Sequence, residues 1–473
     1  MTSDPETSTG WRELMKPALI SRFAFLCLGM WLNAADALVT ITLTPTIAGE
    51  IGGFQYFGWS VAAFLLGAII SGVTSGRLSM ELGLRPAIAV AGVAYAAGCV
   101  VSAIAPDFLV FVLGRLLQGL GAGALSALCY VAINSMFPQR LWVRVLAGLA
   151  GVWGVATLLG PLIGGLFAEA DWWRGAFWFF AVQGLLFIAA TFVLVPASVK
   201  RDQPRPKIPV PQLVVLIVGV SMIAAAGTTG TIALDAALGL GGLVFVGLLL
   251  WLDARSGGVL LPRSAGDLRT VAGAGYFTIF ALEVATIGFS VYGPAFIQTL
   301  QHVSPLVAGY VISAIAAGWT LTAMLVAGIQ NRDGLMIRLG AACVVAGLAA
   351  GAWALPYGSL WIIVAALTLT GAGFGFAWAF LSKTIIAGLS ESERPLGSSA
   401  VPTAQMIGGA VGTAGASALA GLLGLSAGVD PISGPAAGLK LFGAVLPIAL
   451  LGLLAAWRVG RPTPSPAPTA PRP

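Results

Sequence analysis

Residues 23–45 read FAFLCLGMWLNAADALVTITLTP, an apolar run interrupted near its middle by one acidic residue, Asp36. The run is long enough for a helix to cross a hydrocarbon core, which takes roughly 20 residues. A charged side chain at that depth costs roughly 2.5–3.5 kcal/mol on insertion scales, so such residues usually face a cavity and serve a function. This stretch therefore predicts a membrane-spanning helix that carries a functional carboxylate.

The whole chain has the composition of a membrane protein. It is 58% hydrophobic and 9% charged, whereas soluble domains are about 45–50% apolar and about 25% charged. Helices are expected, because each satisfies its own backbone polar groups in lipid. We predict fourteen spans, near 21–45, 57–79, 86–105, 108–135, 142–167, 175–196, 211–229, 233–252, 270–294, 306–328, 337–355, 360–384, 397–424 and 439–457.

Charge placement supports this count. With both termini in the cytoplasm, all of the 24 basic residues except Arg115, Arg174 and Lys440 fall on the cytoplasmic side, as the positive-inside rule requires. The net charge of +6 is then a topology signal and gives no reason to expect nucleic-acid binding. We expect a multi-pass protein of the bacterial cytoplasmic (inner) membrane without a cleavable signal peptide.

Two more ionisable residues lie inside apolar stretches. Glu283 shares a helix face with Thr286 and Ser290, and Arg115 shares one with Gln118. Structural alternatives stay open for Asp36 and Arg115. Asp36 could pair with a polar group of another helix, and Arg115 could serve only as a counter-ion. Asp36, Glu283 and Arg115 are the expected proton-coupling and substrate residues, and the weaker cavity candidates are Asn33, Gln118, Tyr292, Trp319, Trp378 and Gln405.

No cofactor is expected. The four cysteines lie in predicted spans and suit packing better than a metal site, and the single His302 cannot form a metal site alone. The glycines after Arg115 follow no strand, so we reject a nucleotide-binding loop. The chain is therefore not expected to be an enzyme or a nucleotide-driven pump.

Glycine-rich motifs recur along the first half of the chain. They are Gly76 to Arg85 after the second span, Arg115 to Gly123 in the fourth, and Gly151 to Gly165 in the fifth. Small residues let neighbouring helices approach closely, and an internal proline favours a kink. Plain packing is the alternative to a gating role for Gly76, Gly83, Arg85, Gly119, Gly123, Gly154, Gly160, Pro161, Gly164 and Gly165.

These motifs, with Asp36 to Pro45, resemble those of the major facilitator superfamily, and most of all its fourteen-span drug:proton antiporters. The resemblance covers nearly the whole chain. Met80 is a departure, because the loop motif has an aspartate there that helps hold the cytoplasmic side shut, and the neighbouring Glu81 is one position off. The departure leaves open whether this chain makes the family's usual gate contact.

The resemblance implies two six-helix bundles with two extra helices inserted between them. The expected domains are a cytoplasmic segment (1–20), the N-terminal bundle (21–196), a basic linker with the inserted hairpin (197–268), the C-terminal bundle (269–457) and a disordered Pro-rich cytoplasmic tail (458–473).

The functional hypothesis is a proton-coupled exporter of lipophilic, cationic small molecules that works by alternating access. Its partners would be protons, the small-molecule substrate and the lipid bilayer, and we expect a monomer. One alternative is export of a specific endogenous metabolite, such as an antibiotic or siderophore. Another is a non-transporting membrane sensor or scaffold on the same fold.

Overall fold

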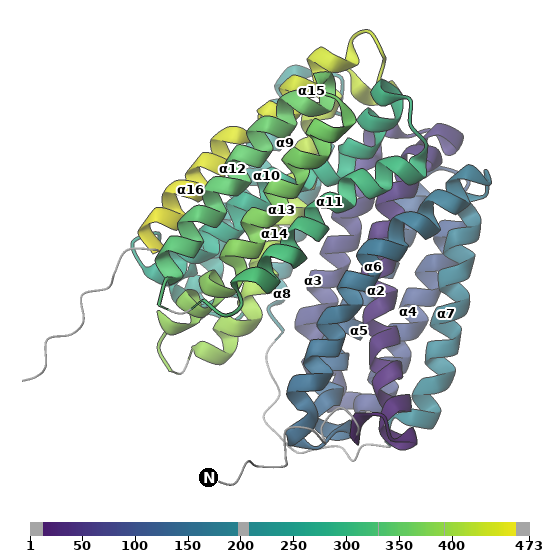
Figure 1. Cartoon of the computed structure of the whole chain (residues 1–473), viewed down its shortest axis with the longest axis vertical. Coiled ribbons are helices and arrows are strands. Elements are labelled where there is room, and N and C mark those ends of the chain that lie inside the picture. The colour runs from purple at the N-terminus through teal and green to yellow at the C-terminus, as the bar shows by residue number, and fades with distance from the viewer. Residues whose placement is uncertain (1–12, 197–207, 330, 392, 460–473) are drawn as a thin grey trace, which may run out of the picture.

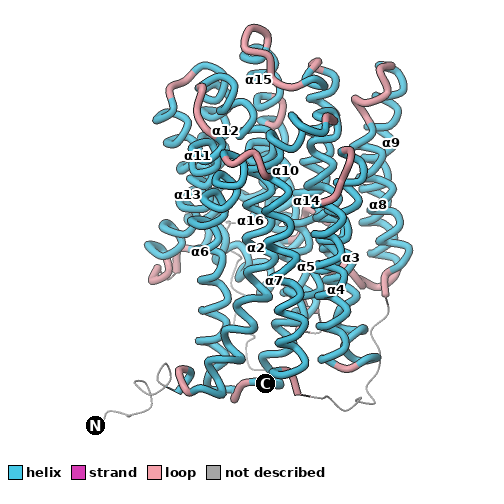
Figure 2. Tube along the Cα trace, turned by 90° about the vertical axis from the view of Figure 1, so that its right-hand side faces the viewer, coloured by secondary structure: helices cyan, strands magenta, loops and turns pink. Residues whose placement is uncertain are grey.

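The computed structural model describes residues 13–196, 208–329, 331–391 and 393–459, and these are almost entirely helical (Figure 1, Figure 2). The linker cations Lys200, Arg201, Arg205 and Lys207 and the Pro-rich tail beyond residue 459 lie outside the described residues. The helices are α2 (Pro17–Ile51), α3 (Phe57–Leu82), α4 (Leu84–Ala103), α5 (Phe108–Met136), α6 (Trp142–Glu169), α7 (Trp173–Leu194), α8 (Val210–Ala225), α9 (Ile232–Arg255), α10 (Val271–Gln301), α11 (Pro305–Val326), α12 (Asp333–Tyr357), α13 (Leu360–Ala387), α14 (Arg394–Leu422), α15 (Gly434–Gly443) and α16 (Leu446–Val459).

The predicted class, an all-α polytopic membrane protein, is confirmed. Within the described residues, twelve helical segments are long and apolar enough to cross a membrane. α8 has only 16 residues, short of the roughly 20 that a full crossing takes. α14 has 29 residues but is rich in glycine, serine and threonine, and it is not among the twelve. Each predicted span nevertheless overlaps a helix.

Several helix ends differ from the prediction. α2 continues past Pro45 to Ile51, because an internal proline removes one hydrogen bond without ending the helix. α8 ends at Ala225, before Gly227, whose φ of +87° is incompatible with a right-handed helix. The predicted last span is two helices, α15 and α16. Pro447, in the first turn of α16, has no N–H for the carbonyl of Gly443.

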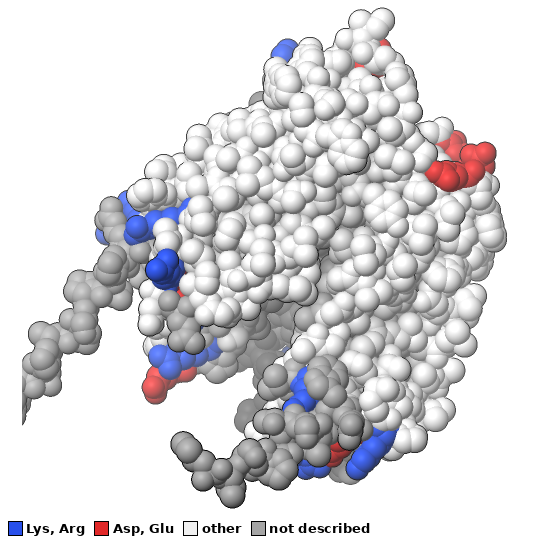
Figure 3. Space-filling view, viewed as in Figure 1, with Lys and Arg blue, Asp and Glu red and all other residues white. Residues whose placement is uncertain are grey.

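The helices form two bundles (Figure 1), and a hairpin of α8 and α9 lies beside them (Figure 2). α2 to α7 pack together, and α10 to α16 pack together, while α8 packs on α9 and reaches α14 and α3. We call the end of the molecule that carries Arg77, Arg85, Arg140, Lys383 and Arg394 the basic end, and the end that carries Glu50, Glu169 and Asp171 the acidic end. Figure 3 shows the basic side chains along the lower edge of both lobes.

At the acidic end the two bundles touch. Gly165 of α6 is so close to α11 that a Cβ there would lie 2.6 Å from the Leu306 Cα. The Tyr310 hydroxyl of α11 donates a hydrogen bond of 3.1 Å to the Leu158 carbonyl of α6. On the other side of the seam, the rings of Phe57 (α3) and Tyr292 (α10) lie 5.2 Å apart. The bundles are therefore closed against each other at this end.

Toward the basic end the same helix faces separate. In α3, Gly72 follows Gly58 by fourteen residues, so the two lie on nearly one face. A Cβ on Gly58 would meet Ser417 of α14, whereas nothing lies within 4 Å of one on Gly72. In α6, Gly151 and Gly154 continue the face of Leu158 and Pro161 and also meet nothing within 4 Å. Figure 3 shows the resulting hollow between the lobes, which opens at the basic end.

Candidate functional site

A buried ion pair lies inside the N-terminal bundle. Asp36 of α2 and Arg115 of α5 are joined by a hydrogen-bonded contact of 2.8 Å between Arg115 Nη1 and Asp36 Oδ2. Their side chains are 0% and 2% exposed. Two charges at this depth are stabilised only with good geometry and further hydrogen bonds, because burial removes their hydration.

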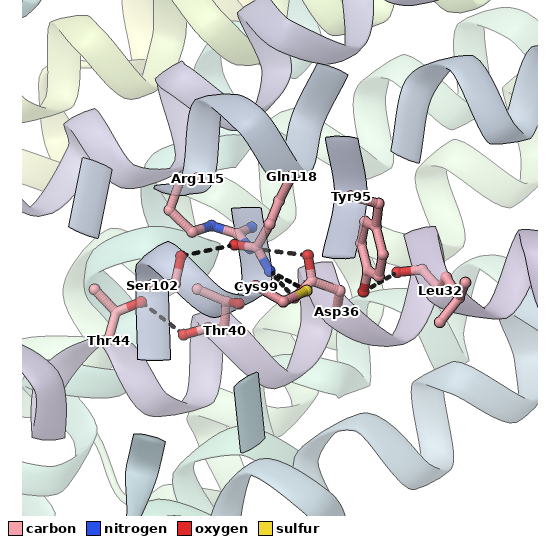
Figure 4. A network of polar contacts seen from close by, with 9 residues as sticks. All are labelled: Leu32, Asp36, Thr40, Thr44, Tyr95, Cys99, Ser102, Arg115 and Gln118. Carbon is pink, nitrogen blue, oxygen red and sulfur yellow. Dashed lines mark hydrogen bonds and ion pairs between the residues drawn. The ribbon is translucent and has the colours of Figure 1, made fainter. Parts of the chain in front are cut away.

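Gln118 completes that geometry (Figure 4). Its Nε2 donates 3.2 Å to Asp36 Oδ1, and its Oε1 accepts from Arg115 Nη1 at 2.8 Å. Ser102 of α4 donates 3.1 Å to the same Oε1, and Gln118 Nε2 also lies 3.1 Å from the Cys99 Sγ. One amide side chain therefore touches both charges and ties α2 and α5 to α4.

Close helix approach seals this cluster from water. A Cβ on Gly119 would come within 2.0 Å of the Phe64 carbonyl oxygen of α3, and one on Gly121 within 2.3 Å of the Tyr95 nitrogen of α4. The Phe64 ring lies under the guanidinium of Arg115, 4.4 Å from ring centroid to Cζ. The fourth-span glycines thus bring α3 and α4 against α5 around the ion pair.

Glu283 has different surroundings. It lies near the middle of α10, is half-buried, and its Oε2 accepts a hydrogen bond of 3.1 Å from Gln405 of α14. It is in none of the ion pairs found among the described residues. Gly409, beside Glu283, faces Leu65 of α3, where the two bundles still meet. Glu283 therefore lies at the head of the opening between the bundles, with a neutral partner.

The remaining cavity candidates fall into three places. Asn33 donates 2.9 Å to the Ser126 hydroxyl inside the N-terminal bundle. Tyr292 is buried at the closed seam against Phe54 and Phe57, away from the opening. Trp319 and Trp378 are partly buried in the C-terminal bundle, with ring centroids 5.3 Å apart.

The motif residues divide by location. Gly119 and Gly123 pack α5 on α3, and Gly160 and Gly164 pack α6 on α2. Gly83, with φ of +91°, ends α3. The neighbouring Arg85 donates 2.7 Å to the Val195 carbonyl.

The loop after α3 also shows where the carboxylate next to Met80 points. Glu81 pairs with Arg77 one turn earlier, at 2.7 Å between Arg77 Nε and Glu81 Oε1. Both side chains are about one-third exposed. Glu81 thus forms a local pair along its own helix, and Gly76 nearby has open space around it.

The sequence did not point to several residues of the polar cluster around Asp36 and of the aromatic group around Trp319. Cys99 and Ser102 are three residues apart on α4, and this spacing on an apolar helix was the available signal for their role beside Gln118. Phe374 was also missed, and its ring stacks on Trp319 at 5.1 Å. Aromatic residues are too common in spans for the sequence to single it out.

Comparison with known proteins agrees with this architecture. The chain is 29% identical, over 97% of its length and 98% of the relative's, to a probable multidrug-efflux transporter of Mycobacterium tuberculosis. It is 26% identical to a thioclapurine efflux transporter of Claviceps purpurea, over 82% of this chain and 74% of that one.

Solved structures share the fold. A D-xylose–proton symporter superposes with a TM-score of 0.63 at 19% identity, covering 93% of this chain and 97% of that one. A nucleoside transporter superposes with a TM-score of 0.66 at 11% identity, covering 93% and 99%. The family model of the Major Facilitator Superfamily matches residues 26–413. That match covers most of the chain, and the two-bundle architecture agrees with it. The chain belongs to the major facilitator superfamily.

Proposed function

We propose that this transporter exports lipophilic cations in exchange for protons, as a member of the fourteen-span drug:proton antiporters. The observation that carries the proposal is the difference between its two mid-span carboxylates. Asp36 is sealed against Arg115, whereas Glu283 is half-buried at the head of the opening, and its hydrogen-bond partner among the described residues is the neutral Gln405. A carboxylate in such surroundings favours either a proton or a cation as its neutralising partner.

Mutual exclusion at Glu283 gives exchange. A protonated carboxyl releases its proton into the opening, and the carboxylate then binds the cation from the basic end. After the bundles rock, a proton from the other side displaces the cation. In the described part of the chain, the helices packed against α10 carry their other charges near their ends, apart from Asp36, which is already paired. One carboxylate is thus available to one positive charge.

Asp36 and Arg115 are proposed as a second coupling group. A proton on Asp36 would remove the counter-charge of Arg115 and loosen the contact between α2 and α5. Because the pair is sealed in this conformation, that step requires the N-terminal bundle to rearrange. Arg115 is therefore assigned to coupling, with no direct contact to the cargo.

The aromatic cluster of Trp319, Phe374 and Trp378 is proposed to hold the lipophilic part of the cargo. Trp319 and Trp378 are partly buried, so neither residue is fully enclosed by its neighbours. Aromatic faces attract both flat apolar groups and cations. The name of the mycobacterial relative, a probable multidrug-efflux transporter, supports an export role.

The membrane orientation follows from charge. We assign the basic end to the cytoplasm of a bacterial cell by the positive-inside rule, so the opening faces inward. All fourteen predicted spans are proposed to cross the membrane, with α15 and α16 together forming the last. Both termini lie inside, and the chain is a monomer. The proposed units are the bundles 21–196 and 269–457, with 197–268 as the inserted hairpin and its linker.

Proton release on cargo binding tests this function. Purified protein in weakly buffered detergent would be titrated with tetraphenylphosphonium, and the pH followed with a dye. Wild type is expected to release up to about one proton per bound cation, since the two share one carboxylate. Glu283→Gln should abolish the release. Equal proton release from wild type and Glu283→Gln would refute the assignment.

A second candidate is export of one endogenous metabolite. The thioclapurine efflux transporter, 26% identical, is a relative whose name gives a single cargo. The same opening and coupling residues would serve such a cargo. Binding of no cation in a panel, together with a tight response to one metabolite of the source organism, would favour this candidate.

A further inference from the structure

The α8–α9 hairpin lies across the seam between α3 and α14. α8 packs against α14 of the C-terminal bundle and also reaches α3 of the N-terminal bundle. It has 16 residues and ends near the acidic end, where the bundles are closed. The hairpin therefore touches both halves of a transporter whose halves must move apart.

Its attachment to the C-terminal bundle is backbone against backbone. A Cβ on Gly227, in the turn after α8, would lie 2.1 Å from the Ala418 carbonyl oxygen of α14, and one on Gly421 would lie 2.1 Å from the Gly227 oxygen. At the basic end, the Arg263 nitrogen after α9 donates 3.4 Å to Glu393, which precedes α14. The hairpin is fixed to α14 near both of its ends.

Among the described residues, one side chain of the N-terminal bundle forms a hydrogen bond to the hairpin. The Trp59 Nε1 of α3 donates a hydrogen bond of 2.9 Å to the Ala224 carbonyl of α8. The last four carbonyls of a helix have no intrahelical donor. Trp59 therefore satisfies a carbonyl that would otherwise be unpaired at the end of α8.

This bond lies beside the closed seam. A Cβ on Gly58, the residue before Trp59, would lie 2.8 Å from both the Thr413 carbonyl oxygen and the Ser417 Cβ of α14. The Ser417 hydroxyl also donates 3.5 Å to the Gln55 carbonyl before α3. When the acidic end opens, α3 has to leave α14, and the hairpin stays with α14.

We propose that the inserted hairpin is a strap that holds the acidic end closed, and that Trp59 is its positioning residue. Opening that end breaks the Trp59–Ala224 bond and leaves a carbonyl without a donor in an apolar environment, which is unfavourable. The strap thereby biases the conformational equilibrium toward the form that opens at the basic end. The strap acts on the rocking motion of the two bundles and would act in the same way for any cargo.

Distances between spin labels at the two ends test the strap. The acidic-end pair places cysteines at Glu169 and Ile432, and the basic-end pair places them at Gln139 and Glu391. All four positions are exposed. Cys27 and Cys343, which are partly buried, are replaced by alanine, whereas Cys99 and Cys129 are buried and can stay.

Trp59→Phe keeps an aromatic ring and removes the donor. Loss of one neutral hydrogen bond is expected to raise the ratio of acidic-end-open to acidic-end-closed molecules by roughly 2- to 10-fold. At the basic end, the ratio of short-distance to long-distance label pairs should rise by the same factor. Trp31→Phe is the matched control, because Trp31 donates 3.0 Å to Gln183 within the N-terminal bundle. It should shift neither pair.

A second variant releases the strap from its other side. Gly227→Ala forces a side chain into the Ala418 backbone and should shift both label pairs in the same direction as Trp59→Phe. Unchanged populations in both variants would overturn the proposal, and so would an equal shift in Trp31→Phe. A general loss of stability would broaden both pairs without the reciprocal change.

Discussion

Arg115→Met isolates the energetic role of the buried ion pair. The variant keeps a long side chain against Phe64 and removes the charge that lies 2.8 Å from Asp36. Asp36 is fully buried, and Gln118 would be its main remaining polar partner. Removing one partner of a buried pair typically costs about 3–5 kcal/mol, because the other charge is left uncompensated. We expect that loss in the free energy of unfolding.

Equilibrium unfolding in mixed micelles, followed by tryptophan fluorescence, measures this loss. The double variant Asp36→Asn/Arg115→Met should recover most of it, since no buried charge is left and the introduced amide can still accept a hydrogen bond from Gln118. Arg77→Met is the control: the Arg77–Glu81 pair is about one-third exposed and should contribute less than about 1 kcal/mol. If Arg115→Met lost no more than this control, the ion pair would not be sealed as described. A double variant as unstable as the single one would contradict the account equally.

Three further predictions concern the opening between the bundles. Glu283→Gln should change the unfolding free energy by no more than about 1.5 kcal/mol, because its partner is neutral. Unfolding midpoints measure this change in stability, and proton release measures the loss of function separately. Gly154→Leu fits the open form, in which nothing lies within 4 Å of a Cβ there, but should block closure, so the short-distance population of the basic-end pair disappears. Trp319→Leu should weaken tetraphenylphosphonium binding by roughly 3- to 10-fold in calorimetry, the range expected for loss of one aromatic contact. Trp361→Leu, at a highly exposed position outside the cluster, should leave that binding unchanged.

The sequence predicted the helices well because each span is a local property. Length and apolarity locate most of the stretches, whereas α14 is rich in small polar residues and α8 is short. Single residues that end or break a helix account for the misplaced helix ends. Gly227 and Pro447 are such residues, and both were visible in the sequence. Pro45 shows the limit of that rule, since α2 continues through it.

The site was partly predictable for the same reason. Asp36 and Arg115 lie at similar depths in their spans, so a pair between them could be expected from the chain alone. The difference between Asp36 and Glu283 could not, because it depends on how the two bundles tilt. The position of Tyr292 at the closed seam has the same origin. The strap formed by α8 and α9 likewise depends on a contact between residues 165 positions apart.

Proton movement in liposomes is the decisive test of proton-coupled cation export through Asp36 and Glu283. Purified protein would be reconstituted with a pH dye inside, lipophilic cations added outside, and wild type compared with Asp36→Asn and Glu283→Gln. Cation-dependent proton movement is expected in wild type and in neither variant. Proton-coupled transport retained in both amide variants, or no movement with any cation in wild type, would contradict it.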